Sequence, residues 1–220
     1  MIIWEPLFLS LKVAAIATII AALLGLLCGR LLARAAFPGL SLIDTLCLLP
    51  LVLPPSVIGF LLIVALGRNG IVGKWLQDGL GVQLLFTWQG AVVAAVVVAF
   101  PLMYQTARNV FQRVDKELEQ AARTDGANEW QVFWRITVPL ASPALLAGVL
   151  LTFARSLGEF GATLMIAGNI PGQTQTAPLA VFFAFEAGDV QTAWVLSGGL
   201  ILISWGCVSL HRWLLHRTDR

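Results

Sequence analysis

Long runs of uncharged, mostly apolar residues recur along the whole chain. Six such runs occupy residues 13–29, 45–67, 79–107, 136–154, 160–185 and 190–210. Each approaches or exceeds the roughly 20 residues that a helix needs to cross about 30 Å of hydrocarbon. The pattern therefore predicts an all-α integral membrane protein.

The run at residues 160–185 differs from the other five because it holds three glycines and two prolines around the polar segment 173–176. Such a run cannot form one continuous lipid-facing helix. We expect instead two short helical pieces joined by a loop on the outer side of the membrane. The remaining runs predict about five spanning helices, near residues 7–32, 45–66, 88–107, 139–157 and 190–211.

The basic residues around these spans are unevenly divided. Ten lie on one set of connecting segments: Arg30, Arg34, Arg108, Arg113, Lys116, Arg123, Arg135, Arg212, Arg217 and Arg220. Only three, Lys12, Arg68 and Lys74, lie on the other set. Because cytoplasmic segments carry the excess of Lys and Arg, the bias predicts an outside N-terminus and a cytoplasmic C-terminus. The first span, whose basic residues follow it, is expected to be an uncleaved anchor rather than a signal peptide.

The composition narrows the function classes. Hydrophobic residues make up 58% of the 220 positions, charged residues make up 12%, and the mean hydropathy is +0.85. Soluble domains carry about 25% charged residues, so a soluble enzyme, a disordered tail and a secreted disulfide scaffold are excluded. The net charge of +2 comes from scattered basic residues and predicts no nucleic-acid partner.

The metal-binding residue types are few and dispersed. Cys28, Cys47 and Cys207 lie in apolar stretches, where cysteine usually acts as a small buried hydrophobe. We expect no disulfide and no metal site, because neither a CxxC motif nor a His/Cys cluster is present. His211 and His216 are five residues apart and are expected to be interfacial residues.

The most distinctive cytoplasmic segment is the loop at residues 109–138. Acidic residues and helically spaced apolar residues predict a helix over residues 114–125. Gly126 suits the left-handed position that closes a helix. Asn128 and Gln131 form a weak capping box that opens a second helix. The expected product is a helix–glycine–helix elbow with Ala127 and Asn128 exposed at its corner.

The second helix of the elbow presents Trp130, Phe133 and Trp134 before Pro139 begins the next span. Tryptophan commonly anchors in the lipid interface, and it is also a typical anchor of protein interfaces. The aromatic residues therefore have two interpretations, lipid anchoring or insertion into a groove of a partner protein.

The elbow also resembles a known family signature. The run Glu119-Gln120-Ala121-Ala122-Arg123-Thr124-Asp125-Gly126-Ala127, followed by Ile136-Thr137-Val138-Pro139, is similar to the signature loop of membrane subunits of ATP-binding-cassette (ABC) importers. In that family the pattern is Glu-Ala-Ala, three residues, Gly, nine residues and Ile-x-Leu-Pro. Gln120 replaces the family's Glu, which removes a charge but keeps a hydrogen-bonding group, and Val138 replaces its Leu.

The resemblance implies that the elbow is a coupling helix that docks into a cleft of a cytoplasmic ATPase. The residues it assigns to this role are Gln120, Ala121, Ala122, Gly126, Ala127, Asn128, Trp130 and Phe133. ATP and Mg²⁺ would be bound by the ATPase, and this chain would bind no cofactor.

Three further segments, at residues 48–59, 153–163 and 168–174, are similar to molybdate permeases, with sulfate/thiosulfate and tungstate permeases as near relatives. The resemblance covers nearly all of residues 7–210. It implies a type I importer permease fold, one transmembrane permease domain over residues 1–220, and import of molybdate or a related oxyanion. It also implies a bacterial or archaeal cytoplasmic membrane, a second copy of the chain as partner, and a soluble oxyanion-binding protein outside.

Molybdate is a dianion, and a bare charge is very costly in a low-dielectric interior, so a hydrated path is required. Five helices are too few to enclose one, which favours a path between two copies. The cluster of Pro50, Pro54 and Pro55 is expected to break the second span. The freed backbone amides then either face a cavity or mark a simple packing kink.

Arg155 and Glu159 lie four residues apart in the fourth span. Intramembrane charges are functional candidates by default, and an i,i+4 ion pair is the structural alternative. The candidate pathway or gate residues are Pro54, Pro55, Ser56, Arg155, Ser156 and Glu159. Gly25 and Gly29 form a GxxxG pattern that serves either internal packing or a dimer contact.

Two other classes of membrane protein are alternatives, an intramembrane enzyme and a membrane scaffold. An intramembrane protease needs a GxSxG or HExxH motif, and neither occurs. Gly73-Lys74 fails the nucleotide-binding loop pattern, because Arg68 stands at the first glycine position and Trp75 follows the lysine. ATP must therefore be hydrolysed by another chain. A membrane scaffold would not need the cytoplasmic elbow, so loss of ATPase binding on altering the elbow would separate that class from a transporter.

Overall fold

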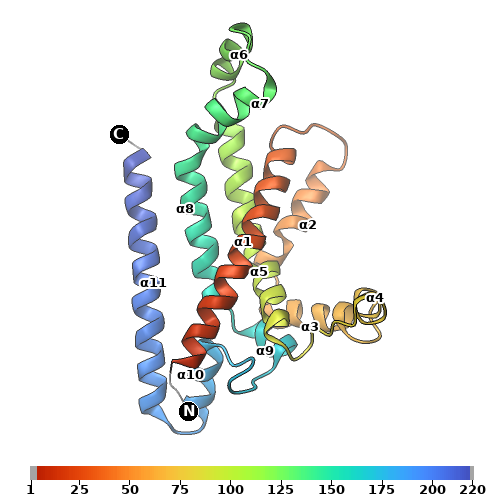
Figure 1. The fold of residues 1–220 in the computed structure, drawn as a ribbon, viewed down its shortest axis with the longest axis vertical. Helices are drawn as coiled ribbons and strands as arrows, with labels where there is room; N and C mark the ends of the chain where they lie inside the picture. Colours follow the sequence, from red (N-terminus) through yellow and green to blue (C-terminus); the bar gives the residue numbers. More distant parts are fainter. Residues whose placement is uncertain (1–3, 219–220) are drawn as a thin grey trace.

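The computed structural model describes residues 4–218 and the side chains of residues 4–214. Its elements in chain order are α1 (Glu5–Ala33), α2 (Leu40–Val52), α3 (Pro55–Leu66), α4 (Ile71–Leu80), α5 (Trp88–Arg113), α6 (Lys116–Thr124), α7 (Glu129–Val132), the π-helix η1 (Phe133–Thr137), α8 (Val138–Leu157), α9 (Gly161–Ala167), α10 (Ala177–Glu186) and α11 (Val190–Thr218). No strand occurs in this described part, and the predicted all-α class is confirmed (Figure 1).

Four helical segments are long and apolar enough to cross a membrane: α1, α5, the continuous stretch Glu129–Leu157 and α11. The fifth predicted span is the pair α2 and α3, which is bent by 114° at its break. Leu53 is extended at this break, with ψ 140°, and the next two residues are prolines, which lack the N–H that would continue the helix. Pro50, by contrast, stays inside α2. The predicted break of the second span is thus confirmed, and it falls at residues 53–54.

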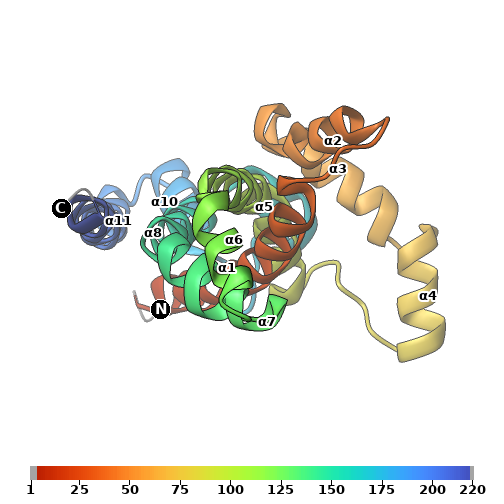
Figure 2. The ribbon, with the colours of Figure 1, turned by 90° about the horizontal axis from the view of Figure 1, so that it is seen from above.

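Helices α1, α5 and α8 form the centre of the bundle, with α11 at one edge and α2, α3 and α4 at the opposite edge (Figure 2). Helices α1 and α5 approach closely at Gly25 and Gly29. A β-carbon added at Gly25 would lie 2.8 Å from the Cβ of Met103, and one at Gly29 would lie 2.6 Å from the Cβ of Ala107. The GxxxG pattern therefore packs α1 against α5 within one chain.

The segment after the fourth span has the predicted form of two short helices, α9 and α10, joined by the loop 168–176. Helix α4, however, has no counterpart among the predicted helices, because glycine, which is frequent at residues 67–81, lowers helix propensity. The glycines instead allow close packing: β-carbons at Gly70 and Gly73 would collide with carbonyl oxygens at the end of α3. Helix α4 forms against that end because its own glycines leave the space.

The two ends of the molecule differ in character. The elbow made of α6 and α7, the C-terminal end of α1 and the C-terminus lie toward one end, and the N-terminus lies at the other (Figure 1). Nδ1 of His211 in α11 lies 3.0 Å from the carbonyl oxygen of Ala147, at the middle of α8. His211 thus joins α11 to α8, and the side chain of His216 lies outside the described residues.

Cys28, Cys47 and Cys207 are free and half-buried in this structure.

Candidate functional site

The elbow is built from the local signals that the sequence carries. Asp115 caps α6 by accepting a hydrogen bond of 2.8 Å from the Glu117 amide. Gly126 adopts φ +89° and closes the helix, as predicted. Asn128 and Gln131 complete a reciprocal capping box, with bonds of 2.9 and 3.0 Å, and so open α7. The predicted helix–glycine–helix elbow is confirmed, with Asn128 exposed at its corner, but the prediction that Ala127 is exposed there was wrong, because Ala127 is half-buried.

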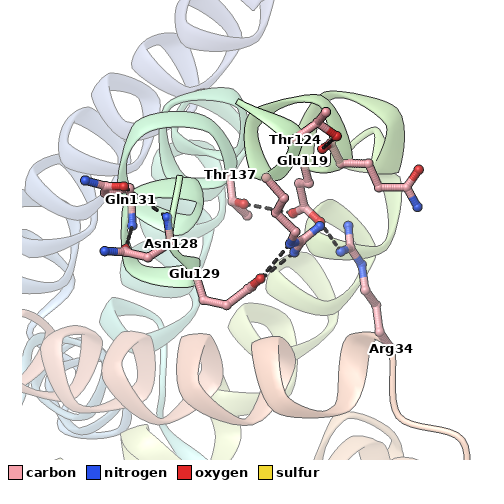
Figure 3. Close-up of polar contacts among 9 residues, drawn as sticks. Arg34, Glu119, Thr124, Asn128, Glu129, Gln131 and Thr137 are labelled. Atoms are coloured by element: carbon pink, nitrogen blue, oxygen red, sulfur yellow. Dashed lines mark hydrogen bonds and ion pairs between the residues drawn. The ribbon is translucent and has the colours of Figure 1, made fainter. Parts of the chain in front are cut away.

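A buried carboxylate holds the elbow on the membrane domain (Figure 3). Glu119 is 1% exposed, and its Oε2 accepts a hydrogen bond from the guanidinium of Arg34 at the end of α1. Its Oε1 accepts a bond of 2.8 Å from the Thr137 hydroxyl in η1. Arg34 also donates to the Val114 carbonyl at 3.1 Å. Glu119 therefore ties α6 to α1 and to the start of the α8 span.

The protonation of this carboxylate follows from its partners. Burial alone would raise the pKa of Glu119, but the hydrogen bonds from Arg34 and Thr137 and the charge of Arg34 outweigh it and hold the pKa below its ordinary value. Glu119 is therefore ionised at neutral pH. Sequence reasoning placed Glu119 in the signature run but assigned it no partner, since Arg34 lies 85 residues away.

A second ion pair closes the elbow on its solvent side. Arg123 contacts Glu129 through two hydrogen bonds of 2.6 and 3.0 Å, which join α6 to α7. The bond from Arg123 lowers the pKa of Glu129 and raises that of Arg123. Because both groups face solvent, this pair contributes little stability. The buried Glu119 network is the stronger brace.

The surface of the elbow is available to a partner. Gln120, Ala121 and Asn128 are exposed, Ala122 and Ala127 are half-buried, and Trp130 is 70% exposed. Phe133 instead packs inward, against a cluster that includes Phe111 and Ala141, and the Arg30 guanidinium lies 5.5 Å from its ring centroid. Of the aromatic residues assigned to coupling, Trp130 therefore points outward and Phe133 supports the elbow from within.

The charges of the fourth span form an ion pair. Nη1 of Arg155 lies 2.9 Å from Oε2 of Glu159. Glu159 is buried, and its Oε1 accepts a bond of 2.9 Å from the Ala162 amide, so this carboxylate also caps α9. Ser156 is buried beside the pair, and its hydroxyl has no hydrogen-bond partner among the described residues. The structural alternative that the sequence left open, an i,i+4 ion pair, is thus present.

The proline break meets this region. A β-carbon added at Gly161, the first residue of α9, would lie 3.0 Å from the Cβ of Pro55 and 3.5 Å from the amide nitrogen of Ser56. Pro54, Pro55 and Ser56 are all exposed. The fold therefore brings the two predicted pathway segments, about 100 residues apart in the sequence, next to one another.

Comparison with known proteins identifies the family. The family model described as binding-protein-dependent transport system inner membrane component matches residues 17–220. The chain belongs to this family.

Curated relatives of this family member include molybdenum permeases. It is 48% identical to the putative molybdenum transport system permease protein YvgM of Bacillus subtilis, covering 91% of this chain and 88% of that one. It is 49% identical to the molybdenum transport system permease protein ModB of Escherichia coli K12, covering 81% and 78%. It is 38% identical to the sulfate transport system permease protein CysT of the same organism, covering 88% and 72%.

Solved structures agree on the fold. A bacterial ABC transporter that imports the polysaccharide alginate matches with a TM-score of 0.74, covering 98% of this chain and 78% of that one at 14% identity. The MetNI methionine ABC transporter matches with a TM-score of 0.69, covering 99% and 94% at 16% identity. The predicted type I ABC importer permease fold is confirmed. The chain is a multi-pass inner membrane transport component, which favours the transport interpretation over a scaffold or an intramembrane enzyme.

Proposed function

We propose that this chain is the membrane-spanning permease subunit of an ATP-driven importer of molybdate. The choice of molybdate rests on sequence identity. The chain is 47–49% identical to molybdenum permeases but only 36–38% identical to sulfate permeases, over comparable shares of the chain. A permease for tungstate or sulfate is the second candidate, because these oxyanions share tetrahedral geometry and charge.

The elbow couples transport to a separate cytoplasmic ATPase, which binds ATP and Mg²⁺. The coupling surface consists of Gln120, Ala121, Ala122, Gly126, Ala127, Asn128 and Trp130, with Phe133 behind it. An exposed tryptophan beside small residues suits a shallow cleft on a partner, since Trp is a common interface anchor. The Glu119 brace makes the elbow a stiff extension of α1 and α8, so force applied at the elbow reaches the spans.

The elbow lies in the cytoplasm and the N-terminus lies outside. The ten-to-three division of basic residues supports this orientation. A cysteine placed at Asn128 should react with a permeant thiol reagent and resist an impermeant one in intact cells. Labelling of Asn128→Cys by the impermeant reagent would reverse the assigned topology.

The transporter contains two copies of this chain, related by a twofold axis along the pathway. Helix α2 has no buried residue within one chain, and Val52 at its end is 82% exposed. Pro54, Pro55 and Ser56 then line the hydrated gap between the copies, and Arg155 and Glu159 stand behind them as a gate. Ser56→Cys should cross-link between copies in a nucleotide-dependent way, and unchanged accessibility with and without ATP would contradict this arrangement.

A soluble oxyanion-binding protein delivers the substrate from outside. The family description names dependence on a binding protein, and one structural neighbour is an alginate transporter in complex with a periplasmic protein bound to an alginate pentasaccharide. Binding of ATP would close the two ATPases, draw the two elbows together and open the pathway outward.

The decisive experiment is ATP-dependent uptake into vesicles by the reconstituted complex. Labelled molybdate should accumulate, and unlabelled tungstate and sulfate should be tested as competitors. Molybdate uptake that resists excess sulfate supports the proposal. Uptake of sulfate in preference to molybdate would select the second candidate, and binding of ATPase without uptake of any oxyanion would remove the transport assignment.

A further inference from the structure

A cavity lies at the end of the molecule opposite the elbow. It has a volume of about 660 Å³ and is walled by the start of α1, the residues around the start of α5, and the loop before α10. Its wall mixes aromatic rings with charged and amide groups. Those that matter here are Trp4, Glu5, Phe8, Lys12, Trp88 and Gln175.

Two opposite charges share this cavity without pairing. The Lys12 ammonium lies 3.8 Å from the centroid of the Trp88 ring, and no carboxylate of the described residues lies within ion-pair distance of it. The Glu5 carboxylate likewise has no ionic partner in the described part of the chain, and its Oε2 lies against Gly172, where an added β-carbon would be 4.0 Å away. A ligand that carries one anionic and one cationic group would satisfy both.

The cavity opens onto an apolar stripe. Along α1, exposed apolar residues form a row that winds gradually around the helix, at spacings of four and eleven residues: Trp4, Phe8, Ile19, Leu23, Leu27 and Leu31. Lys12 is also exposed and falls in the same register, one turn beyond Phe8. It is the only charge on this face between Glu5 and Arg30. This apolar row therefore ends, at the start of α1, in a charged and aromatic pocket, which is the composition that interfacial Trp and snorkelling Lys residues give at a membrane surface.

We propose that this cavity binds the head group of phosphatidylethanolamine. The lipid phosphate lies against the Lys12 ammonium, the primary ammonium of the head group donates to the Glu5 carboxylate, and an acyl chain follows the α1 stripe. Phosphatidylglycerol, an anionic lipid without an amine, would place no cation beside Glu5. A choline head group has no N–H to donate to that carboxylate.

The site is independent of which oxyanion the transporter carries. A segment of the soluble binding protein is the other occupant that such an outer cavity could receive. Continuity of the cavity with the apolar row on α1 favours the lipid, because a row of exposed leucines complements an acyl chain and does not complement the polar surface of a soluble protein.

The test uses the delipidated full-length chain, in detergent, incubated with one defined lipid at a time. Native mass spectrometry counts retained phosphatidylethanolamine, phosphatidylglycerol or phosphatidylcholine per chain. The variants are Lys12→Gln and Glu5→Gln, and the control is Lys74→Gln, which removes an exposed charge outside the cavity. Circular dichroism and monodispersity establish that each variant is folded.

The wild-type chain and the Lys74 control should retain phosphatidylethanolamine in preference to the other two lipids. Lys12→Gln should weaken retention of all three by roughly tenfold, because it removes a charge-assisted hydrogen bond to phosphate. Glu5→Gln should abolish only the preference for ethanolamine. Equal retention of phosphatidylglycerol by the wild type, or unchanged retention in Lys12→Gln, would overturn the proposal.

Displacement of the lipid by soluble glycerophosphoethanolamine at equal concentration would likewise overturn it, since the acyl stripe would then add nothing. Impaired binding of the soluble binding protein in Lys12→Gln, with lipid retention unchanged, would assign the cavity to protein docking instead.

Discussion

Replacement of Glu119 by glutamine tests whether the elbow acts as a rigid lever. The substitution keeps the size of the side chain and leaves one polar atom able to accept from Thr137, but it removes the charge that pairs with Arg34. After the change, the Arg34 guanidinium keeps only its 3.1 Å bond to the Val114 carbonyl. The elbow should therefore detach from α1 more often than in the wild type.

The magnitude follows from the burial of the two partners. Breaking a fully buried ion pair by removing one member costs about 3–5 kcal/mol. The Glu119 side chain is 2% exposed, but that of Arg34 is 27% exposed, so water offsets part of the loss on the arginine side. We expect a destabilisation of about 2 kcal/mol for elbow docking, which corresponds to roughly a thirtyfold rise in the detached population.

Hydrogen exchange on the chain in lipid nanodiscs measures this population directly. Amides of α6 and η1 should exchange roughly thirtyfold faster in Glu119→Gln, while amides in the middle of α5 remain unchanged. Glu117→Gln is the matched control, because Glu117 lies on the same helix and is exposed. In the reconstituted complex, Glu119→Gln should also raise the amount of ATP hydrolysed per oxyanion imported.

Equal exchange in Glu119→Gln and Glu117→Gln would refute the brace, because the buried carboxylate would then hold nothing that the exposed one does not. Faster exchange throughout the molecule would place the effect in global stability rather than in the elbow. Only local exchange combined with lost coupling supports the lever.

Three further predictions concern pH, backbone and packing. Because the pKa of Glu119 is lowered in the folded chain, its stabilisation of the elbow should be complete above about pH 5 and should be lost as the pH falls below about 4.3. Hydrogen exchange of the elbow amides, measured between pH 7 and about 3.5, should show this loss in the wild type. It should show no such loss in Glu119→Gln. Gly126→Val should uncouple ATP hydrolysis from uptake without blocking membrane insertion, because a β-branched residue at φ +89° costs about 1–3 kcal/mol of backbone strain. Gly126→Asn should retain more uptake than Gly126→Val. Wild-type uptake in the valine variant would show that the glycine is not required. Gly29→Ala should lower the midpoint of thermal unfolding, because overpacking α1 on α5 costs about 1–3 kcal/mol. Gly206→Ala should leave the midpoint unchanged, because a β-carbon there meets no atom within 4 Å. Equal midpoints for the two variants would contradict the tight α1–α5 contact.

Much of this structure could be predicted because its signals are local. The span lengths follow from uninterrupted apolar runs, and the break in the second span follows from two adjacent prolines at residues 54 and 55. Gly126 and the Asn128–Gln131 box define the elbow within a window of six residues. Each of these features is determined by residues that are close together in the sequence.

The remaining features depend on pairings between distant segments. No local sequence signal predicts that Arg34 pairs with Glu119, or that Lys12 lies over the ring of Trp88. Helix α4 was missed for a related reason. Glycine lowers helix propensity, and only the close approach of α3 explains why glycines occur there.

The elbow and the proline break are linked by a continuous series of contacts. Thr137, which bonds to Glu119, lies in the π-helix that runs directly into α8, and α8 ends twenty residues later at Leu157, about 30 Å along the helix axis. Just beyond that end, Glu159 caps α9, whose first residue contacts Pro55.

Contiguity by itself does not make a coupling pathway, because a pathway also needs an element with two states. The α2–α3 break supplies a candidate for that element. Its backbone is interrupted at the point where α9 contacts it, so α3 can pivot against α2 without breaking a ladder of helical hydrogen bonds. If the elbows move when an ATPase closes, the Arg155–Glu159 ion pair at the end of α8 and the capped start of α9 should transmit that movement to this pivot.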